Sequence, residues 1–231
     1  MPGILHIVAT PIGNLDDITK RAIDTLSTAD LILCEDTRVT KKLLNAYNIS
    51  KPVQSLHQHS DDEKIKSIIK SLNSDQSIAL VSDAGTPGVN DPGGKLVATA
   101  LNQGITVSPI PGPSALTTAI SVCGFPMEKF TYLGFPPNKK GRKTFFEDVM
   151  SRDEASIFFE STHRLIKALE SMMESVQDTK EKGRLVCVCR EMTKIYETIY
   201  RGPAEKVLID LKNSSVKGES VIIVAPKKYK E

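Results

Sequence analysis

The sequence predicts an α/β protein with two domains, and three observations support this. The first half of the 231-residue chain alternates apolar runs with amphipathic stretches, which is typical of βα units with a mostly parallel sheet and helices on both faces. The alternation breaks at 109–113, where prolines cluster around Gly112. In the second half, apolar segments at 185–190 and 196–201 have no helix between them, which favours an antiparallel pair in a mixed sheet with flanking helices. We therefore expect domains at 1–113 and 114–231.

The N-terminal domain should contain four strands and three clear helices. Apolar runs predict strands at 4–9, 31–33, 78–81 and 106–110, and helical spacing predicts helices around 18–26 and 65–72. A further helix should begin at Pro92, with Asp91 as its cap and Leu101 on its buried side, and end at Gly104.

The C-terminal domain should contain helices and strands in mixed order. The patterns predict helices at 115–123, 142–151, 163–175 and 204–212, and strands at 156–160, 185–190, 196–201 and 220–225.

Composition describes an ordinary globular protein. Hydrophobic residues make up 40% and charged residues 25%, and no apolar run approaches the roughly 20 residues that span a bilayer. The N-terminus shows no basic leader, so we expect a cytoplasmic protein. The cysteines, Cys34, Cys123, Cys187 and Cys189, should be buried reduced thiols, because the Cys-x-Cys pair has no second ligand pair at zinc-site spacing.

Charge is unevenly distributed although the net charge is only +2. Residues 1–113 carry 10 basic against 12 acidic side chains, which leaves 20 against 16 for residues 114–231. The basic excess gathers in Lys139, Lys140, Arg142 and Lys143, which follow a loop marked by glycine and proline at 134–137. These four are candidate phosphate contacts, although most basic runs are simply solvated surface.

Five loop clusters combine chain punctuation with reactive side chains. The most informative is 82–93, where Ser82-Asp83 ends an apolar strand and three glycines and two prolines follow. Glycines let backbone approach a ligand closely, although a tight strand-to-helix turn is the simpler interpretation. The others lie at 10–15, 34–38, 111–115 and 189–194. All five stand at predicted strand ends, so we expect them together at one rim of the sheets.

The sequence lacks the motifs of several common nucleotide-binding and catalytic sites. The sequence has no G-x-G-x-x-G, no P-loop and no G-x-S-x-G. His57 and His59 with Asp61 form only a weak metal pattern, and we expect no metal site.

The motifs VATPIGNLDDIT, CEDTR, SDAGTPGVNDPG, PGPSA, FESTHR and CREMTK occur in this order along the chain. Through these motifs and their order, the chain resembles the tetrapyrrole methylase superfamily and, within it, the ribosomal RNA small subunit methyltransferase I family. The resemblance implies a homodimer of two-domain subunits with S-adenosylmethionine between the domains. It also implies methylation of a cytidine ribose 2′-hydroxyl in the decoding region of 16S rRNA. The chain departs from the family pattern at Thr162 and Pro136, and neither change removes a reactive group.

The resemblance also implies site residues. The cofactor-binding set carried over from the family is Pro11, Ile12, Asp83, Ala84, Gly85, Thr86, Ser114 and Ala115. The catalytic candidates are Glu35, Asp36, Arg38, Arg164, Arg190 and Glu191, with Glu160, Lys194, His163 and the pair His57/His59 as further possibilities. The arginines are better suited to clamp phosphate or ribose than to act as bases, and each candidate could instead form a structural ion pair.

Two other functions remain open at this point. The same cofactor site could methylate a tetrapyrrole precursor, or the protein could be an rRNA-binding assembly factor without activity. The basic loop at 139–143 argues against the first, and the glycines of 82–93 argue against the second.

Overall fold

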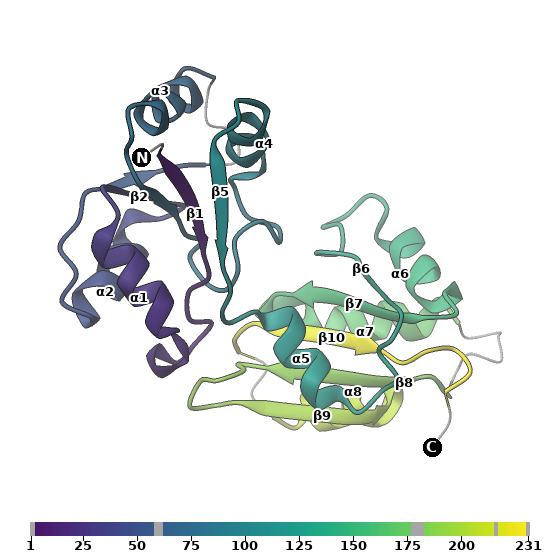
Figure 1. The fold of residues 1–231 in the computed structure, drawn as a ribbon. Helices are drawn as coiled ribbons and strands as arrows, with labels where there is room; N and C mark the ends of the chain where they lie inside the picture. The colour runs from purple at the N-terminus through teal and green to yellow at the C-terminus, as the bar shows by residue number, and fades with distance from the viewer. Residues whose placement is uncertain (1–2, 58–61, 177–182, 215–216, 230–231) are drawn as a thin grey trace. The chain divides into compact units, whose positions relative to one another are not determined.

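The computed structural model describes residues 3–57, 62–176, 183–214 and 217–229 (Figure 1). The chain divides into two compact units, Met1–Ser114 and Ala115–Glu231. The expected domain boundary lies one residue before this division.

Unit 1 is built on a parallel five-stranded sheet in the order β3-β2-β4-β1-β5. Its strands are β1 (Ile4–Val8), β2 (Leu31–Cys34), β3 (Val53–Ser55), β4 (Ile78–Leu80) and β5 (Thr106–Ile110). Its helices are α1 (Lys20–Thr28), α2 (Thr37–Ala46), α3 (Asp62–Asn73) and α4 (Gly94–Asn102), with a short 3-10 turn η1 (Leu15–Asp17).

The central strand β4 is apolar throughout because helices cover both faces of the sheet (Figure 1). Ala79 packs with residues of α1 and α2, whereas Ile78 and Leu80 pack with residues of α3 and α4. All three are at most 2% exposed. The two cores therefore hold the parallel strands so that the carboxyl ends of β1, β2, β4 and β5 share one edge.

Unit 2 is built on a mixed five-stranded sheet in the order β6-β7-β10-β8-β9. Its strands are β6 (Phe130–Tyr132), β7 (Ala155–Glu160), β8 (Leu185–Arg190), β9 (Thr198–Pro203) and β10 (Ser220–Val224). Its helices are α5 (Ala115–Cys123), α6 (Arg142–Ser151), α7 (Leu165–Glu174) and α8 (Ala204–Lys212), with a 3-10 turn η2 (Thr162–Arg164). The expected antiparallel pairing of the segments near 185–190 and 196–201 is confirmed as β8 with β9.

One main core holds unit 2 together. Phe158, Val188 and Ile222 project from one face of the sheet into a cluster with α6, α7 and α8, and all three are fully buried. Helix α5 lies on the other face (Figure 1). Cys187 and Cys189 are buried with their sulfur atoms 3.7 Å apart, and all four cysteines are free and buried, as expected.

Two predictions about α4 are wrong. The helix begins at Gly94 rather than Pro92, and its N-cap is Gly93, so Asp91 does not cap it. The chain turns into α4 at Gly93 with φ +128°, where a β-carbon would lie 2.5 Å from Leu80 Cδ2. Only glycine fits there, which fixes the start of the helix. Leu101 is 58% exposed, so it does not belong to the buried side.

The structure also contains elements that the sequence patterns did not reveal, namely α2, β3 and β6. The two strands have three residues each, too few for a period to be recognised, and α2 exposes most of its surface. Within the described residues, no helix combines the length and the apolar character needed to cross a membrane.

Candidate active site

Four of the five predicted loop clusters lie at the carboxyl edge of the unit 1 sheet. Thr10, after β1, and Gly85, after β4, exchange two backbone hydrogen bonds of 2.9 and 3.0 Å. The Thr10 hydroxyl also donates to the carbonyl of Ser82 at 3.2 Å. The loops that follow β1 and β4 are therefore fastened together.

The remaining two loops of unit 1 join the same arrangement. The Thr86 hydroxyl donates to the carbonyl of Pro113 at 3.0 Å, which ties the loop after β4 to the loop after β5. The Asp83 carboxylate accepts the Asp36 N–H at 3.0 Å, which ties it to the loop after β2. The structure thus brings together the predicted residues Pro11, Ile12, Asp83, Ala84, Gly85, Thr86 and Ser114, and Ala115 follows in sequence. The fifth cluster, 189–194, belongs to unit 2.

We call the four joined loops, at 10–15, 34–38, 82–93 and 111–115, the tied loops. Gly85 lies where two of them meet. Its φ is +81°, and a β-carbon there would lie 3.3 Å from Ile12 Cγ2. Gly112, in the loop after β5, packs as closely against Ala9, because a β-carbon on Gly112 would lie 3.1 Å from the β-carbon of Ala9. The loops therefore approach one another closely at two points where a side chain would crowd them.

This edge is also acidic. Asp36 caps α2 by accepting the Arg38 N–H, and the hydrogen bonds from Arg38 lower the pKa of Asp36 to about 2. Burial and, after it, the nearby charges of Glu35 and Asp83 together raise the pKa of Asp91 to about 6, against a hydrogen bond with Ser82. Four carboxyl groups thus gather where β2 and β4 end, which favours a cationic ligand.

Asp91 is a residue of this edge that sequence reasoning treated only as a helix cap. Its sequence signal, an aspartate before proline and glycine, is shared by many turns. Its raised pKa arises chiefly from burial and then from the charges of Glu35 and Asp83, and burial depends on tertiary packing, so no local pattern could have revealed it.

The raised pKa of Asp91 has a consequence for stability. The carboxyl group takes up its proton near pH 6 in the folded protein but near 3.8 when unfolded, so the folded state loses stability as pH rises through this window. Asp91→Asn should therefore stabilise the protein by about 1 kcal/mol near neutral pH, after allowing for partial exposure. Urea unfolding at several pH values measures this. The gain should vanish towards about pH 4, and a gain that persists there would contradict the assignment. Asp24→Asn, an exposed change on α1, is the control.

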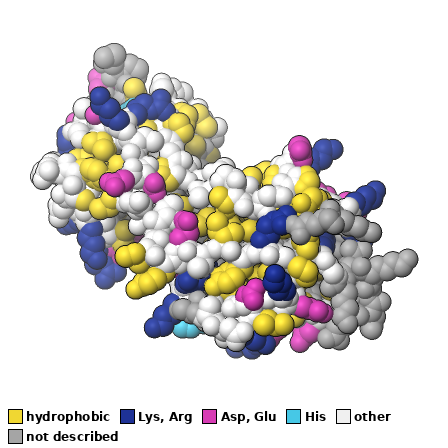
Figure 2. All heavy atoms as spheres, turned by 90° about the horizontal axis from the view of Figure 1, so that it is seen from below, with side chains coloured by type: hydrophobic (Ala, Val, Ile, Leu, Met, Phe, Trp, Pro, Cys, Tyr) yellow, Lys and Arg dark blue, Asp and Glu magenta, His cyan; other side chains and the backbone are white. Residues whose placement is uncertain are grey.

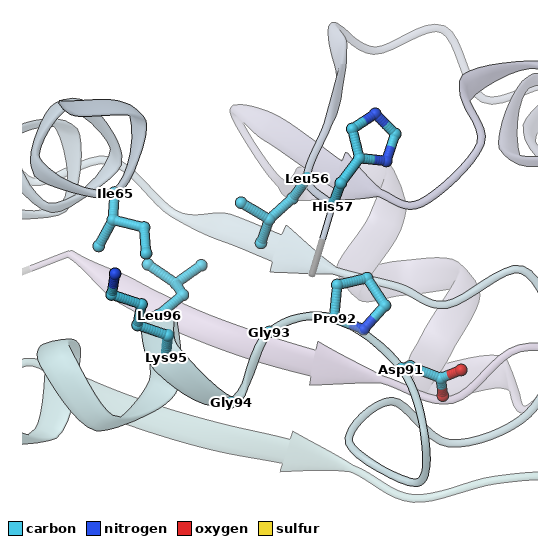
Figure 3. Close-up of a pocket in the computed structure, with 9 residues that line it drawn as sticks. All are labelled: Leu56, His57, Ile65, Asp91, Pro92, Gly93, Gly94, Lys95 and Leu96. Carbon is cyan, nitrogen blue, oxygen red and sulfur yellow. The ribbon is translucent and has the colours of Figure 1, made fainter. Parts of the chain in front are cut away.

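A pocket of about 220 Å³ lies beside the acidic edge, between the start of α4 and the residues after β3 (Figure 3). Ile65 and Leu96 point toward one another in it, whereas the Asp91 carboxyl group points away from them. The pocket does not include Asp83 or Gly85, but Asp91, Pro92 and Gly93 from the end of the same loop line it. His57 lines it, and His59 and Asp61 lie outside the described residues. No group of three metal-ligating side chains occurs in the part of the chain that the structure describes.

Unit 2 gathers the other predicted site residues at one end of its sheet. Strand pairing aligns Ser220 with Glu160 on one side and with Arg190 on the other, and Arg190 with Thr198. The motifs FESTHR and CREMTK therefore meet at this end, although their first members, Phe159 and Cys189, are 30 positions apart in the chain. The Thr162 hydroxyl accepts the Gly218 N–H at 2.7 Å and lies 2.6 Å from the Gly218 carbonyl.

Arg190 is placed differently from what a catalytic or clamping role requires. It is 5% exposed, and its guanidinium donates to Thr198 Oγ1 at 2.9 Å and to the carbonyls of Lys217 and Tyr196 at 2.6 and 3.1 Å. Every nitrogen of the group thus has a partner inside the protein. Arg190 holds the loops of this end together and is not available to substrate.

Glu191 is likewise engaged. Its carboxylate accepts Lys194 Nζ at 2.9 Å and the Glu219 N–H at 3.0 Å, and its backbone is left-handed with φ 51°. Burial opposes ionisation, but these hydrogen bonds leave the pKa of Glu191 lowered. Glu191 therefore fastens the loop between β8 and β9 to the start of β10.

The basic loop divides into exposed and buried members. Lys139 and Lys140 are exposed, and among the described residues no partner contacts their ammonium groups. Lys143 is exposed and lies 3.8 Å from Glu147. Arg142 is only 13% exposed and pairs with Glu160, so it is not a free phosphate contact. On the face drawn in Figure 2, Lys and Arg side chains are separated by uncharged surface rather than joined in one patch.

Comparisons with known proteins agree with this architecture. The family model "Tetrapyrrole (Corrin/Porphyrin) Methylases" matches residues 4–208. Among solved structures, diphthine synthase superposes with a TM-score of 0.72 over 96% of this chain and 89% of its own, at 17% identity, which shows a shared fold. The chain is a methylase of this class, and the methyl donor of the class is S-adenosylmethionine.

Curated relatives narrow the class. "Ribosomal RNA small subunit methyltransferase I" of Halalkalibacterium halodurans is 44% identical over 96% of this chain and 75% of its own length. The protein of the same name from Thermotoga maritima is 41% identical over 97% of this chain and 99% of its own. The chain belongs to the ribosomal RNA small subunit methyltransferase I family.

The tied loops fit S-adenosylmethionine. Gly112 is exposed, Gly85 is buried and keeps the loops after β1 and β4 close together, and the carboxylates of the acidic edge suit the positive charge that this cofactor carries at sulfur. The exposed Asp83 and Ala84 and the half-buried Pro11 and Ile12 surround Gly85 in the fastened loops. The assignment of individual residues to the cofactor is a proposal, developed below.

Gly85 provides a test of the cofactor site. Gly85→Ala should weaken S-adenosylmethionine binding by about tenfold, because the new methyl group displaces Ile12 and strains the backbone. Titration calorimetry measures this. Gly88→Ala is the matched control, since Gly88 also has a positive φ, +95°, but a β-carbon there meets nothing within 4 Å. Equal affinity in the two variants would show that the cofactor does not depend on the Gly85 approach.

Proposed function

We propose that the chain transfers a methyl group from S-adenosylmethionine to the ribose 2′-hydroxyl of a cytidine in the decoding region of 16S rRNA. The observation that carries the proposal is the fastening of four strand-end loops at one acidic sheet edge, in a chain of this family. The relatives are named for methylation of small subunit ribosomal RNA, which supports this class of substrate.

In this proposal the tied loops bind the cofactor. Asp83 is the polar anchor, Gly85 allows the close approach of the loops that shapes the site, and Ala84, Thr86, Pro11, Ile12, Ser114 and Ala115 complete it. The cofactor, when bound, supplies a methyl group that is already strongly electrophilic because it is attached to a sulfonium. The expectation that the cofactor lies between the two domains remains part of the proposal.

The chain must then align the ribose oxygen with the methyl group and accept the hydroxyl proton. Of the candidate carboxylates, Asp36 is paired with Arg38 and Glu191 with Lys194. Glu35 follows β2 at the acidic edge, and within the described chain no hydrogen bond or ion pair engages its carboxylate. We assign Glu35 as the general base: its carboxylate would accept the proton of the ribose hydroxyl while the bound cofactor supplies the methyl group to that oxygen.

The partners follow from the same proposal. The substrate is the small ribosomal subunit in the cytoplasm, contacted through Lys139, Lys140 and Lys143, and the active form is a homodimer. The exposed lysines and the basic excess of residues 114–231 support an RNA-binding role for unit 2.

The test compares substrates directly. Labelled methyl from S-adenosylmethionine should appear on 16S rRNA in isolated small subunits, and less on naked 16S rRNA. A tetrapyrrole precursor, offered under the same conditions, should remain unlabelled. Transfer to the precursor alone would overturn the proposal, and subunit binding without any transfer would indicate an inactive assembly factor.

A further inference from the structure

We propose that Glu160 is a positioning residue: it holds Arg164 so that the two terminal nitrogens of that arginine receive one phosphate of the rRNA backbone. The inference rests on the proposed function and identifies a specific phosphate contact for it. It depends on one buried carboxylate with two unequal arginine partners at the carboxyl end of β7.

The Glu160 carboxylate is completely buried and fully used. Oε1 lies 2.9 Å from Arg164 Nε and accepts the Ser161 N–H at 2.8 Å, and Oε2 accepts Arg142 at 3.2 Å. A buried carboxylate without such partners would be strongly unfavourable, so its position and those of both arginines are interdependent. One carboxylate between two guanidinium groups leaves the cluster with a net positive charge.

The two arginines differ in exposure and in which of their guanidinium nitrogens are already engaged. Arg142 is 13% exposed, its NH1 donates to the Pro137 carbonyl at 3.3 Å, and its guanidinium lies over the Phe146 ring. Arg164 is 29% exposed and is held only through Nε, by Glu160 and by Ser161 Oγ at 3.1 Å. Among the described residues, no partner contacts the terminal nitrogens of Arg164.

That arrangement suits a phosphate. The two terminal nitrogens of a guanidinium form a planar fork that matches two phosphate oxygens. Fixing the group through Nε removes much of the side-chain freedom that phosphate binding would otherwise have to restrict. The fork is therefore oriented before RNA arrives.

The surroundings are both rigid and basic. Arg164 stands in η2, directly after β7, and the neighbouring Thr162 is hydrogen-bonded to Gly218. The Arg142 N–H donates to the Lys139 carbonyl at 3.3 Å, so the exposed lysine turn adjoins the same cluster. A site on firmly held elements positions its ligand better than one on a loose loop.

The test measures binding of purified small ribosomal subunits over a range of salt concentrations. Arg164→Ala should weaken binding about tenfold and reduce the slope of log affinity against log salt by about 1, the signature of one lost phosphate contact. Arg164→Lys should restore the slope but only part of the affinity, because an ammonium lacks the fork.

Arg152→Ala is the matched control. Arg152 is 28% exposed and also ion-paired, with Asp148 at 2.8 Å, but it precedes β7 and so lies at the opposite end of that strand. Its removal should leave both affinity and slope at the wild-type values. If Arg164→Ala behaves like Arg152→Ala, the inference is wrong.

Glu160→Gln tests the positioning role itself. It should weaken subunit binding severalfold while S-adenosylmethionine binding, measured by equilibrium dialysis, stays unchanged. If this variant does not fold, the Arg164 variants still decide the proposal. A wild-type protein that methylates subunits while Arg164→Ala binds them normally would refute only this inference; a wild-type protein that transfers no methyl to rRNA would refute the proposed function.

Discussion

Replacing Glu35 with glutamine should lower the rate of methyl transfer by about 10² to 10⁴, the usual contribution of a general base. The ribose hydroxyl is a weak acid, and its oxygen attacks faster when a carboxylate takes the proton. Glu35 is half-buried at the end of β2, close enough to Asp91 for its charge to raise the pKa of that group. Glutamine keeps the size of the side chain but cannot accept the proton.

The loss should appear in kcat and not in cofactor affinity. Single-turnover transfer to small subunits measures the rate, and titration calorimetry measures S-adenosylmethionine binding. Glu128→Gln, an exposed change before β6, is the control. A Glu35→Gln variant with the wild-type rate would remove Glu35 from the chemistry and leave alignment by the tied loops as the main source of catalysis.

Reversing the charge of Lys139 and Lys140 together should weaken binding to small subunits by on the order of 10² at low salt. Both side chains are exposed on the turn before α6, and each phosphate contact that is lost also removes the favourable release of counterions. The salt dependence of binding should become flatter by about 1.5 in slope, whereas cofactor affinity should not change.

The control for this double variant lies near the C-terminus. Lys227→Glu with Lys228→Glu makes the same change of charge in a second basic run. If both double variants weaken binding equally, the effect comes from net charge, and the turn before α6 has no specific role. Stronger weakening at 139 and 140 would support the proposed contact.

The fold and the gathering of four loop clusters at one edge of the unit 1 sheet could be predicted from the sequence because both follow from local patterns. The continuous apolar run at β4 indicates burial on both faces, and parallel strands place their carboxyl ends at one edge. The glycines and prolines after β4 mark the loop whatever the tertiary context. The structure adds the hydrogen bonds, such as Thr10 with Gly85, that fasten the loops to one another.

The roles of charged side chains could not be predicted in the same way. Arg142, Arg164 and Arg190 look alike in sequence, yet backbone carbonyls engage Arg190 and Glu160 engages Arg142. Among the described residues, no partner contacts the two terminal nitrogens of Arg164. Their partners come from strands that are brought together by the register of the unit 2 sheet. The raised pKa of Asp91 also depends on tertiary structure, because burial is its main cause and its neighbours Glu35 and Asp83 follow different strands of unit 1.

The position of the methyl group on 16S rRNA tests the central claim most directly. Small subunits labelled with methyl from S-adenosylmethionine would be taken through partial alkaline hydrolysis, which needs a free 2′-hydroxyl to cleave the chain. We expect hydrolysis to fail at one cytidine of the decoding region and the label to lie on its ribose. Label on a base, with cleavage unchanged at every position, would contradict it.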